Sequence, residues 1–369
     1  MKKLGFALVI GVLAAGLLTS LAFGLQKPPL GLPAVPVPED NAQTPEKVAL
    51  GKKLFMDKRF SADGTVSCST CHTPEKAFAD GLPVAVGIKG LKGTRNSPTV
   101  INAAYYTAQF WDGRVTSLEE QAKGPFLNPV EHGLRDFKPI LEIIRKDPRY
   151  PGMFKKAFGL EPAQITIDHV VRAIAAFERT VVSGDSPFDR YMFGGQKDAM
   201  SEAAIRGLQI YRTKGRCQDC HTIEQTSAIF TDNKYHNLGV GFSVIEPDLF
   251  DLVGKVKKAR KSGQALDDSV LSSKQLSELG RFVVTLDLDD IGRFKTPTLR
   301  NVAVTGPYMH DGSIETLEEV IELYDQGGED NPMLDSGIRP LRLTDREKAD
   351  LLEFLKALTS PEYGKGSSR

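Results

Sequence analysis

The sequence predicts a mainly α-helical protein made of two similar domains. Apolar residues recur at the helical period in several stretches of the 369 residues, and no alternating run is sufficient for a sheet. An internal repeat predicts the duplication, because Asp112 follows Pro98 by fourteen residues and Asp311 follows Pro297 by the same interval. The residues around both pairs also agree, so we expect the two halves to be duplicates.

The chain begins with the features of an export signal. Lys2 and Lys3 precede an uncharged run over residues 4–26, as in the basic and apolar regions of a signal peptide. We expect residues 1–24 to be a signal peptide, although the run is also long enough to remain as an uncleaved membrane anchor. Without these two lysines, 45 basic residues stand against 47 acidic ones, a balance that gives no reason to expect nucleic-acid binding.

Residues 25–43 contain Pro28, Pro29, Pro33, Pro36 and Pro38. Proline cannot continue a regular helix, so we predict a proline-rich linker or an extended arm here. The first domain is expected over residues 44–185. A helix capped at residue 44 opens it, and the apolar stripe of residues 170–177 predicts its closing helix.

The second domain is expected over residues 195–362. Ser201 caps its opening helix, and residues 344–347 form a capping box ahead of an amphipathic closing helix. Capping boxes are also predicted at the repeat-related positions Ser117 and Thr316. The charged segment over residues 244–275 has weak apolar periodicity, so we interpret it as an insertion in the second half.

All four cysteines belong to two C-x-x-C-H motifs, at residues 68–72 and 217–221. In such a motif the two thiols bond to the vinyl groups of a c-type haem, and the histidine is the proximal iron ligand. The residues in these roles are Cys68, Cys71 and His72, then Cys217, Cys220 and His221. A dithiol redox pair, a zinc site or disulfides would leave the two identical histidine placements unexplained. We therefore predict two cytochrome-c-like domains related by duplication, with one covalently bound haem c each.

Several further motifs identify a resemblance. Residues 51–358 resemble the bacterial dihaem cytochrome c peroxidases, and in particular their MauG-type branch. The resemblance rests on the haem motifs at 68–72 and 217–221 and on TRNSPT at 94–99, FWDGR at 110–114, EQAKGP at 120–125, NPVE at 128–131, KTPTLRN at 295–301 and PYMHDG at 307–312. It implies a peroxide-reacting haem on the first motif and an electron-transfer haem on the second.

The resemblance also implies roles for three side chains. Gln121 and Glu131 line the distal side of the first haem, where Glu131 can move a proton between the peroxide oxygens and Gln121 can orient peroxide. Trp111, the single tryptophan, stands where the family has an aromatic bridge between the haems. The alternatives are a solvated carboxylate for Glu131, a polar helix position for Gln121 and a core residue for Trp111.

A calcium ion between the domains is a further implication. Its ligands would be the side-chain oxygen of Asn96 and the backbone carbonyls of Thr305 and Pro307, with waters completing an oxygen shell. Asn96 could equally be an ordinary turn residue.

Two positions depart from the pattern of many family members. Ile88 stands where those members carry a second histidine that closes the first haem, so we expect that haem to be open as prepared. Tyr324 stands at the sixth-ligand position of the second haem, as in MauG-type members, whereas other members have a methionine. Met309 and Met333 lie outside this register. Tyr324 also belongs to the inward stripe of a predicted helix, so a packed tyrosine is the alternative.

Three functions follow as hypotheses. The first is a periplasmic peroxidase that reduces hydrogen peroxide with electrons from a small cytochrome c or a cupredoxin, entering at the second haem and passing through Trp111. The second is a MauG-type oxidase that uses peroxide to modify residues of a partner protein. The third is a dihaem electron carrier, which would have both irons filled. The sequence leaves the oligomeric state open, and a homodimer is one candidate.

Overall fold

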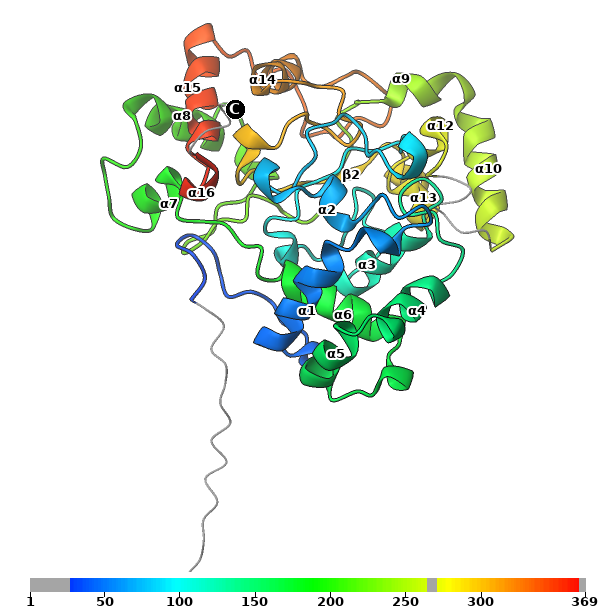
Figure 1. Ribbon diagram of the computed structural model, residues 1–369. Helices are drawn as coiled ribbons and strands as arrows, with labels where there is room; N and C mark the ends of the chain where they lie inside the picture. Colours follow the sequence, from blue (N-terminus) through cyan, green and yellow to red (C-terminus); the bar gives the residue numbers. More distant parts are fainter. Residues whose placement is uncertain (1–26, 264–270, 365–369) are drawn as a thin grey trace, which may run out of the picture.

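The computed structural model describes residues 27–263 and 271–364. Helices dominate these residues, which confirms the predicted fold class (Figure 1). The described residues form one small sheet, the antiparallel pair of β1 (Tyr235–His236) and β2 (Phe294–Lys295). In Figure 1 the first domain lies at the bottom, the second at the upper left, and an additional group of helices at the right.

The first domain is organised around a pair of crossing helices. Its helices are α1 (Pro45–Phe55), α2 (Cys68–Cys71), α3 (Leu118–Leu127), α4 (Lys138–Lys146), α5 (Tyr150–Phe158) and α6 (Ile167–Glu178). Thr44 caps α1 by accepting a hydrogen bond from the Lys47 amide. The first and last of these helices pack closely, since a Cβ on Gly51 would lie 1.8 Å from the carbonyl oxygen of Ala173.

The second domain repeats this arrangement. It contains α7 (Pro187–Met192), α8 (Glu202–Arg212), α14 (Leu317–Gln326), α15 (Asp345–Lys356) and α16 (Pro361–Gly364). Helix α8 crosses α15 as α1 crosses α6, and a Cβ on Gly207 would lie 2.0 Å from the carbonyl oxygen of Asp350. The predicted repeat therefore includes the contact between the opening and closing helices.

The helix caps agree with the sequence in four of five cases, the first of which is Thr44 on α1. Ser201 caps α8, and complete capping boxes begin at Thr316 and Thr344. The capping box expected at Ser117 is only half formed. Ser117 accepts from the amide of Glu120, but the Glu120 carboxylate pairs with Lys123 at 2.9 Å instead of turning back to the cap. A lysine three residues along the same helix face competes for that carboxylate.

The predicted insertion belongs to a small helical unit. Its helices are α9 (Phe242–Ile245), α10 (Leu249–Lys261), α12 (Lys274–Ser277) and α13 (Phe282–Thr285). They share an apolar cluster that includes Ile245, Leu252, Val256 and Phe282. The unit stands at the right-hand edge of the molecule in Figure 1 and continues beyond the expected end of the insertion.

Residues 27–43 form an extended arm that contacts both domains. The Pro33 carbonyl accepts a hydrogen bond from Tyr105 of the first domain at 3.0 Å. The Gly31 carbonyl accepts from the Ala228 amide at 2.9 Å and from Arg300 at 2.8 Å in the second domain. Gly31 has a φ of 84°, and a Cβ there would lie 1.8 Å from a carboxylate oxygen of Asp189, so glycine is required at this position.

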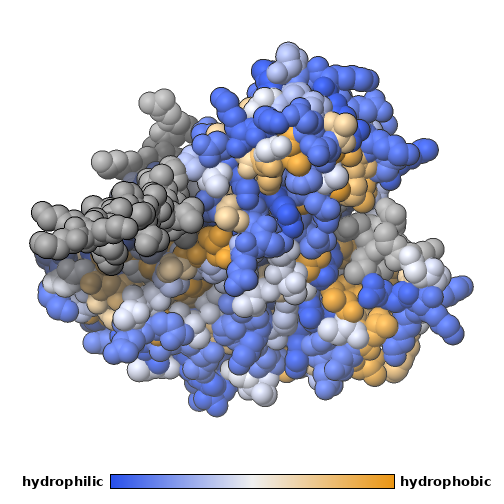
Figure 2. All heavy atoms as spheres, turned by 90° about the horizontal axis from the view of Figure 1, so that it is seen from below, coloured by the Kyte–Doolittle hydropathy of each residue, from blue (hydrophilic) through white to orange (hydrophobic). Residues whose placement is uncertain are grey.

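The surface seen from below in Figure 2 is largely hydrophilic, with apolar side chains in separate patches. Within residues 27–263 and 271–364, no helix has both the length and the apolar character needed to cross a membrane. The predicted signal peptide over residues 1–24 lies outside the described residues.

Candidate haem sites and the wall between them

Both proximal histidines are oriented by a backbone carbonyl. Nδ1 of His72 lies 3.3 Å from the carbonyl oxygen of Phe78, and Nδ1 of His221 lies 2.9 Å from that of Phe230. Because a carbonyl oxygen only accepts, each Nδ1 carries the proton and each Nε2 keeps its lone pair for a metal. Burial lowers the pKa of both imidazoles, which favours the neutral form that binds iron.

Each C-x-x-C-H motif lies in the wall of its own cavity. The first cavity is lined by Cys68, Cys71 and His72, and the second by the corresponding residues at 217, 220 and 221. The four thiols form no disulfide. Two thiols and an oriented imidazole beside a largely apolar cavity are the donor set that a covalently attached haem requires, so the residues present fit this group at both sites.

Gln121 and Glu131 both line the first cavity. Gln121 lies on α3, and its side-chain amide makes no hydrogen bond to the described residues, so it faces the cavity. Glu131 follows the helix in a loop, where its Oε1 accepts a hydrogen bond from Asn128 at 3.0 Å. The two side chains that were predicted for one reaction site therefore lie in the wall of one cavity.

Ile88 supports the loop that carries Glu131. Its amide donates to the Glu131 carbonyl at 3.0 Å, and its side chain is buried against Gly133. Ile88 is absent from the lining of the first cavity. This position therefore carries a buried apolar side chain that lies outside the lining of the first cavity.

Three further residues line the first cavity, although the sequence did not predict them as site residues. Pro125 lies inside α3 and leaves the Gln121 carbonyl without its helical donor. His132 is 3 % exposed, and its Nδ1 lies 3.0 Å from the Phe60 carbonyl. Glu178 is 5 % exposed, and burial raises its pKa to about 8. The position of His132 beside Glu131 could have drawn attention to it, whereas nothing local distinguishes Glu178.

Tyr324 lines the second cavity from α14. Its hydroxyl makes no hydrogen bond to the described residues, and burial raises its pKa. Met309 also lines this cavity, whereas Met333 packs against the helical unit of the insertion. Of the three side chains considered as the sixth ligand of the second haem, Tyr324 and Met309 therefore reach the second cavity.

The two cavities share a wall. The residues that line both are Asn96, Pro98, Thr99, Tyr106, Trp111, Lys295 and Pro297. Trp111 is held there because its indole nitrogen donates to the Asn96 carbonyl at 3.0 Å. The tryptophan predicted between the haems therefore borders both cavities.

The shared wall is built from repeat-related positions. Asn96 and Lys295 correspond in the repeat, as do Trp111 and His310. The Asn96 amide donates to the His310 carbonyl at 2.8 Å, and the Lys295 amide donates to the Trp111 carbonyl, also at 2.8 Å. Each half thus presents the same backbone donor to the same acceptor of the other half, which makes the interface approximately two-fold symmetric.

The residues predicted to bind calcium also meet at this interface. Asn96, Thr305 and Pro307 all line the second cavity. The Asn96 side-chain nitrogen donates to the carbonyls of Leu82 and Pro83 at 2.9 and 3.3 Å. This orientation leaves its side-chain oxygen without a hydrogen bond from the described residues, as a ligand for a hard cation requires.

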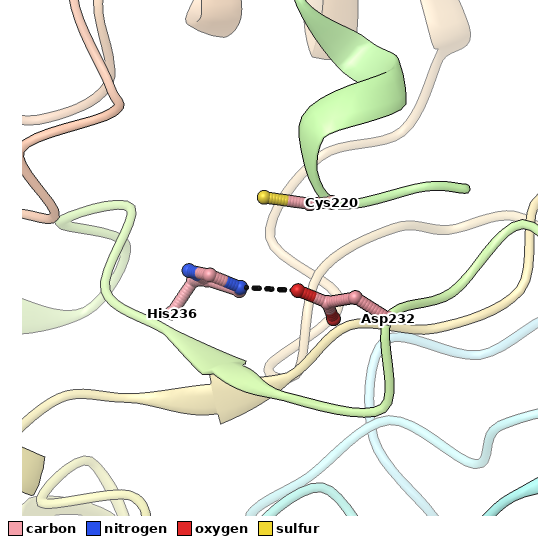
Figure 3. A group of neighbouring side chains, drawn as sticks. All are labelled: Cys220, Asp232 and His236. Carbon is pink, nitrogen blue, oxygen red and sulfur yellow. Dashed lines mark hydrogen bonds and ion pairs between the residues drawn. The ribbon is translucent and has the colours of Figure 1, made fainter.

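A cluster of Cys220, Asp232 and His236 lies beside the second cavity (Figure 3). His236 contacts Asp232 through Nε2 at 2.9 Å and Asp335 through Nδ1 at 2.7 Å. The geometry resembles a metal site, but Cys220 belongs to a haem motif and its sulfur would be a thioether there. The cluster is therefore better described as a histidine held between two carboxylates.

Comparisons with known proteins show the family of the chain. Residues 45–197 match the family model described as di-haem cytochrome c peroxidase. The chain is 37 % identical to the cytochrome-c peroxidase IdrP1 of Pseudomonas sp. (strain SCT), covering 98 % of this chain and 93 % of that protein. It is 38 % identical to the methylamine utilization protein MauG of Methylorubrum extorquens, and the match covers 88 % of this chain and 81 % of that protein.

A solved structure shows the same likeness. A MauG-like protein associated with microbial copper homeostasis superposes with a TM-score of 0.76 at 33 % identity, covering 93 % of this chain and 97 % of that one. Near-complete coverage at these identities extends the likeness through both halves, with a haem c implied in each. The chain is an oxidoreductase that belongs to the di-haem cytochrome c peroxidase and MauG family.

Proposed function

We propose that the protein reduces hydrogen peroxide to water with electrons from a small periplasmic redox protein, either a cytochrome c or a cupredoxin. The unequal lining of the two cavities carries this proposal. The first cavity has an amide and a carboxylate, from Gln121 and Glu131, while the second has the phenol of Tyr324. A site that reacts with a small molecule needs such polar groups, whereas an electron-transfer site needs its ligands filled.

The protein's part in the reaction is to move protons. A haem held by Cys68, Cys71 and His72 would supply the redox chemistry of its iron at the first cavity. The Glu131 carboxylate takes the proton from one peroxide oxygen and returns it to the other, while the Gln121 amide donates a hydrogen bond to the separating charge. With two electrons and two protons from outside, one peroxide gives two waters.

The electrons are proposed to enter at the second domain and to cross the shared wall at Trp111. Support comes from the position of Trp111 in the lining of both cavities and from its fixed indole. A rigid, partly buried aromatic side chain between two redox groups shortens the distance over which an electron must pass.

A calcium ion is proposed at the domain interface, with Asn96, Thr305 and Pro307 as ligands. The free side-chain oxygen of Asn96 and the shared position of the three residues support it. Export to the periplasm through residues 1–24, and assembly into a homodimer, complete the proposal.

A MauG-type oxidase is the second candidate. Tyr324 favours it, because a phenolate ligand stabilises oxidised iron more than a thioether does. In that case peroxide would serve to oxidise side chains of a partner protein instead of an electron donor. The third hypothesis, a non-enzymatic carrier, is set aside because close relatives are cytochrome-c peroxidases.

Spectroscopy of the haem-loaded protein tests the proposal. We expect the oxidised protein to show one high-spin and one low-spin haem by EPR and to react with peroxide before any reductant is added. Sustained turnover with a reduced cytochrome c or cupredoxin would then support a peroxidase over a protein-modifying oxidase. Two low-spin haems that stay inert until partly reduced would overturn the open first site.

A further inference from the structure

Lys295 is a buried cation in the wall between the two haem cavities. It lies on β2, its residue is 7 % exposed, and it lines both cavities. No carboxylate of the described residues forms an ion pair with it, and its ammonium group donates no hydrogen bond to them. Lysine is almost never buried in this way without a partner.

The position of the ammonium group is well defined. Nζ lies 3.2 Å from the centroid of the Tyr106 ring, which also borders both cavities. The Tyr106 hydroxyl accepts a hydrogen bond from the Thr298 amide at 2.8 Å, so the ring is fixed. The backbone of Lys295 is fixed as well, through its hydrogen bond to the Trp111 carbonyl at 2.8 Å.

The surrounding protein does not compensate this charge. An aromatic face recovers only part of the hydration that an ammonium group loses. Burial lowers the pKa of Lys295 to about 7, and no acidic side chain opposes the change. A cation kept at this place therefore requires an anion that the polypeptide itself does not provide.

The haem groups carry the missing anions. The thiols of each motif bond to the vinyl side of a porphyrin, which leaves its two carboxylate groups free to interact with the protein. We infer that the ammonium group of Lys295 binds haem carboxylates at the shared wall, so that one residue positions both haems and raises the reduction potential of each. The inference requires haem attachment in both domains but not the proposed reaction with peroxide.

The repeat explains why one lysine serves both sites. Lys295 corresponds to Asn96, and the backbone amides of these two positions donate across the interface in opposite directions, which holds Lys295 at the boundary of both cavities. A fixed positive charge beside both cavities favours the reduced form of each iron, because reduction lowers the charge of the iron by one.

The test compares haem potentials in Lys295→Met, Lys295→Arg and Lys234→Met. Lys234 is an exposed lysine next to β1, so its replacement removes the same charge outside the wall. In spectroelectrochemical titration without peroxide, we expect Lys295→Met to lower both potentials. The expected fall is at least a tenfold change in each equilibrium constant, which is 59 mV for one electron. Lys295→Arg and Lys234→Met should stay near the parent protein.

Unchanged potentials in Lys295→Met, or a change confined to one haem, would overturn the inference. If haem attachment fails in Lys295→Met, the haem content of the variants is measured instead. Loss of haem in Lys295→Met but not in Lys295→Arg would show that the charge holds the porphyrins. Equal loss in both variants would show a role in packing and would contradict the proposal.

Discussion

At the scale of single residues, the two haem cavities differ in the polar side chains they present. Gln121 and Glu131 border the first cavity, and Tyr324 borders the second. Their identities could be predicted from motifs, and the structure places them in the expected cavities. Their roles remain predictions, and each can be tested by one substitution.

Replacement of Glu131 by glutamine should remove the proton carrier while keeping the shape of the side chain. We expect kcat/KM for peroxide to fall by about 10²- to 10⁴-fold, with both haems retained. Glu142→Gln, an exposed substitution on α4, is the matched control and should leave the rate unchanged. A Glu131→Gln variant within twofold of the parent protein would contradict the assignment.

Replacement of Tyr324 by phenylalanine should remove the proposed sixth ligand of the second haem. We expect the low-spin ferric signal of that haem to be lost or changed in EPR, and its reduction potential to rise. Met309→Leu should leave both properties unchanged. The reverse result, with Met309→Leu altering the signal and Tyr324→Phe preserving it, would assign the ligand to Met309.

Glu178 should make stability depend on pH. Burial raises its pKa from the ordinary 4.5 of a glutamate to about 8, so between these values the unfolded carboxyl is ionised while the folded one keeps its proton. Folded-state stability therefore falls as pH rises through this window. Glu178→Gln should gain stability relative to the parent by on the order of 1–3 kcal/mol between pH 5 and pH 8. The free energy of unfolding of both proteins is measured by urea unfolding at pH 5 and at pH 8. The same difference between variant and parent at both pH values would contradict this prediction.

At the scale of elements, the crossing of the opening and closing helices defines each domain. Gly207 is buried where α8 meets the backbone of α15. The helices themselves could be predicted from caps and apolar stripes, because both signals are local. The close crossing could not, because it depends on a contact between residues far apart in the chain.

Gly207→Ala should lower the free energy of unfolding by about 1–3 kcal/mol, because the new methyl group would meet a backbone oxygen that cannot move freely. Gly152→Ala is the matched control, since nothing lies within 4 Å of a Cβ there and the residue is in α5. That change should be neutral or stabilise by up to about 1 kcal/mol. Equal melting temperatures of the two variants would refute the packing argument.

At the scale of the whole molecule, the arm and a buried ion pair join the chain's first described residues to the second domain. Arg300 and Asp189 are both fully buried and contact each other at 2.8 Å, and Arg300 also binds the Gly31 carbonyl. The sequence left open whether residues 25–43 are a linker or an arm. The part described, from residue 27, is an arm because its carbonyls find donors in both domains.

Asp189→Asn should lower the free energy of unfolding by about 3–5 kcal/mol, because it leaves the Arg300 charge buried without its partner. Asp185→Asn, in an exposed pair with Arg190, should cost no more than about 1 kcal/mol. Urea unfolding of the haem-loaded variants measures the difference. Similar urea midpoints for Asp189→Asn and Asp185→Asn would show that the buried ion pair does not stabilise the contact between the arm and the second domain.

The sequence by itself predicted the haem attachment sites, and it determined the duplication, most of the helix caps and the family. These features depend on residues close together in the chain, whose chemistry needs no knowledge of distant neighbours. Only the tertiary structure decided that Lys295 borders both cavities, and that His132 and Glu178 reach the first. Those positions lie where the two halves meet or where helices cross. Burial there raises the pKa of Glu178 and lowers the pKa of Lys295, and the sequence around either residue does not reveal this burial.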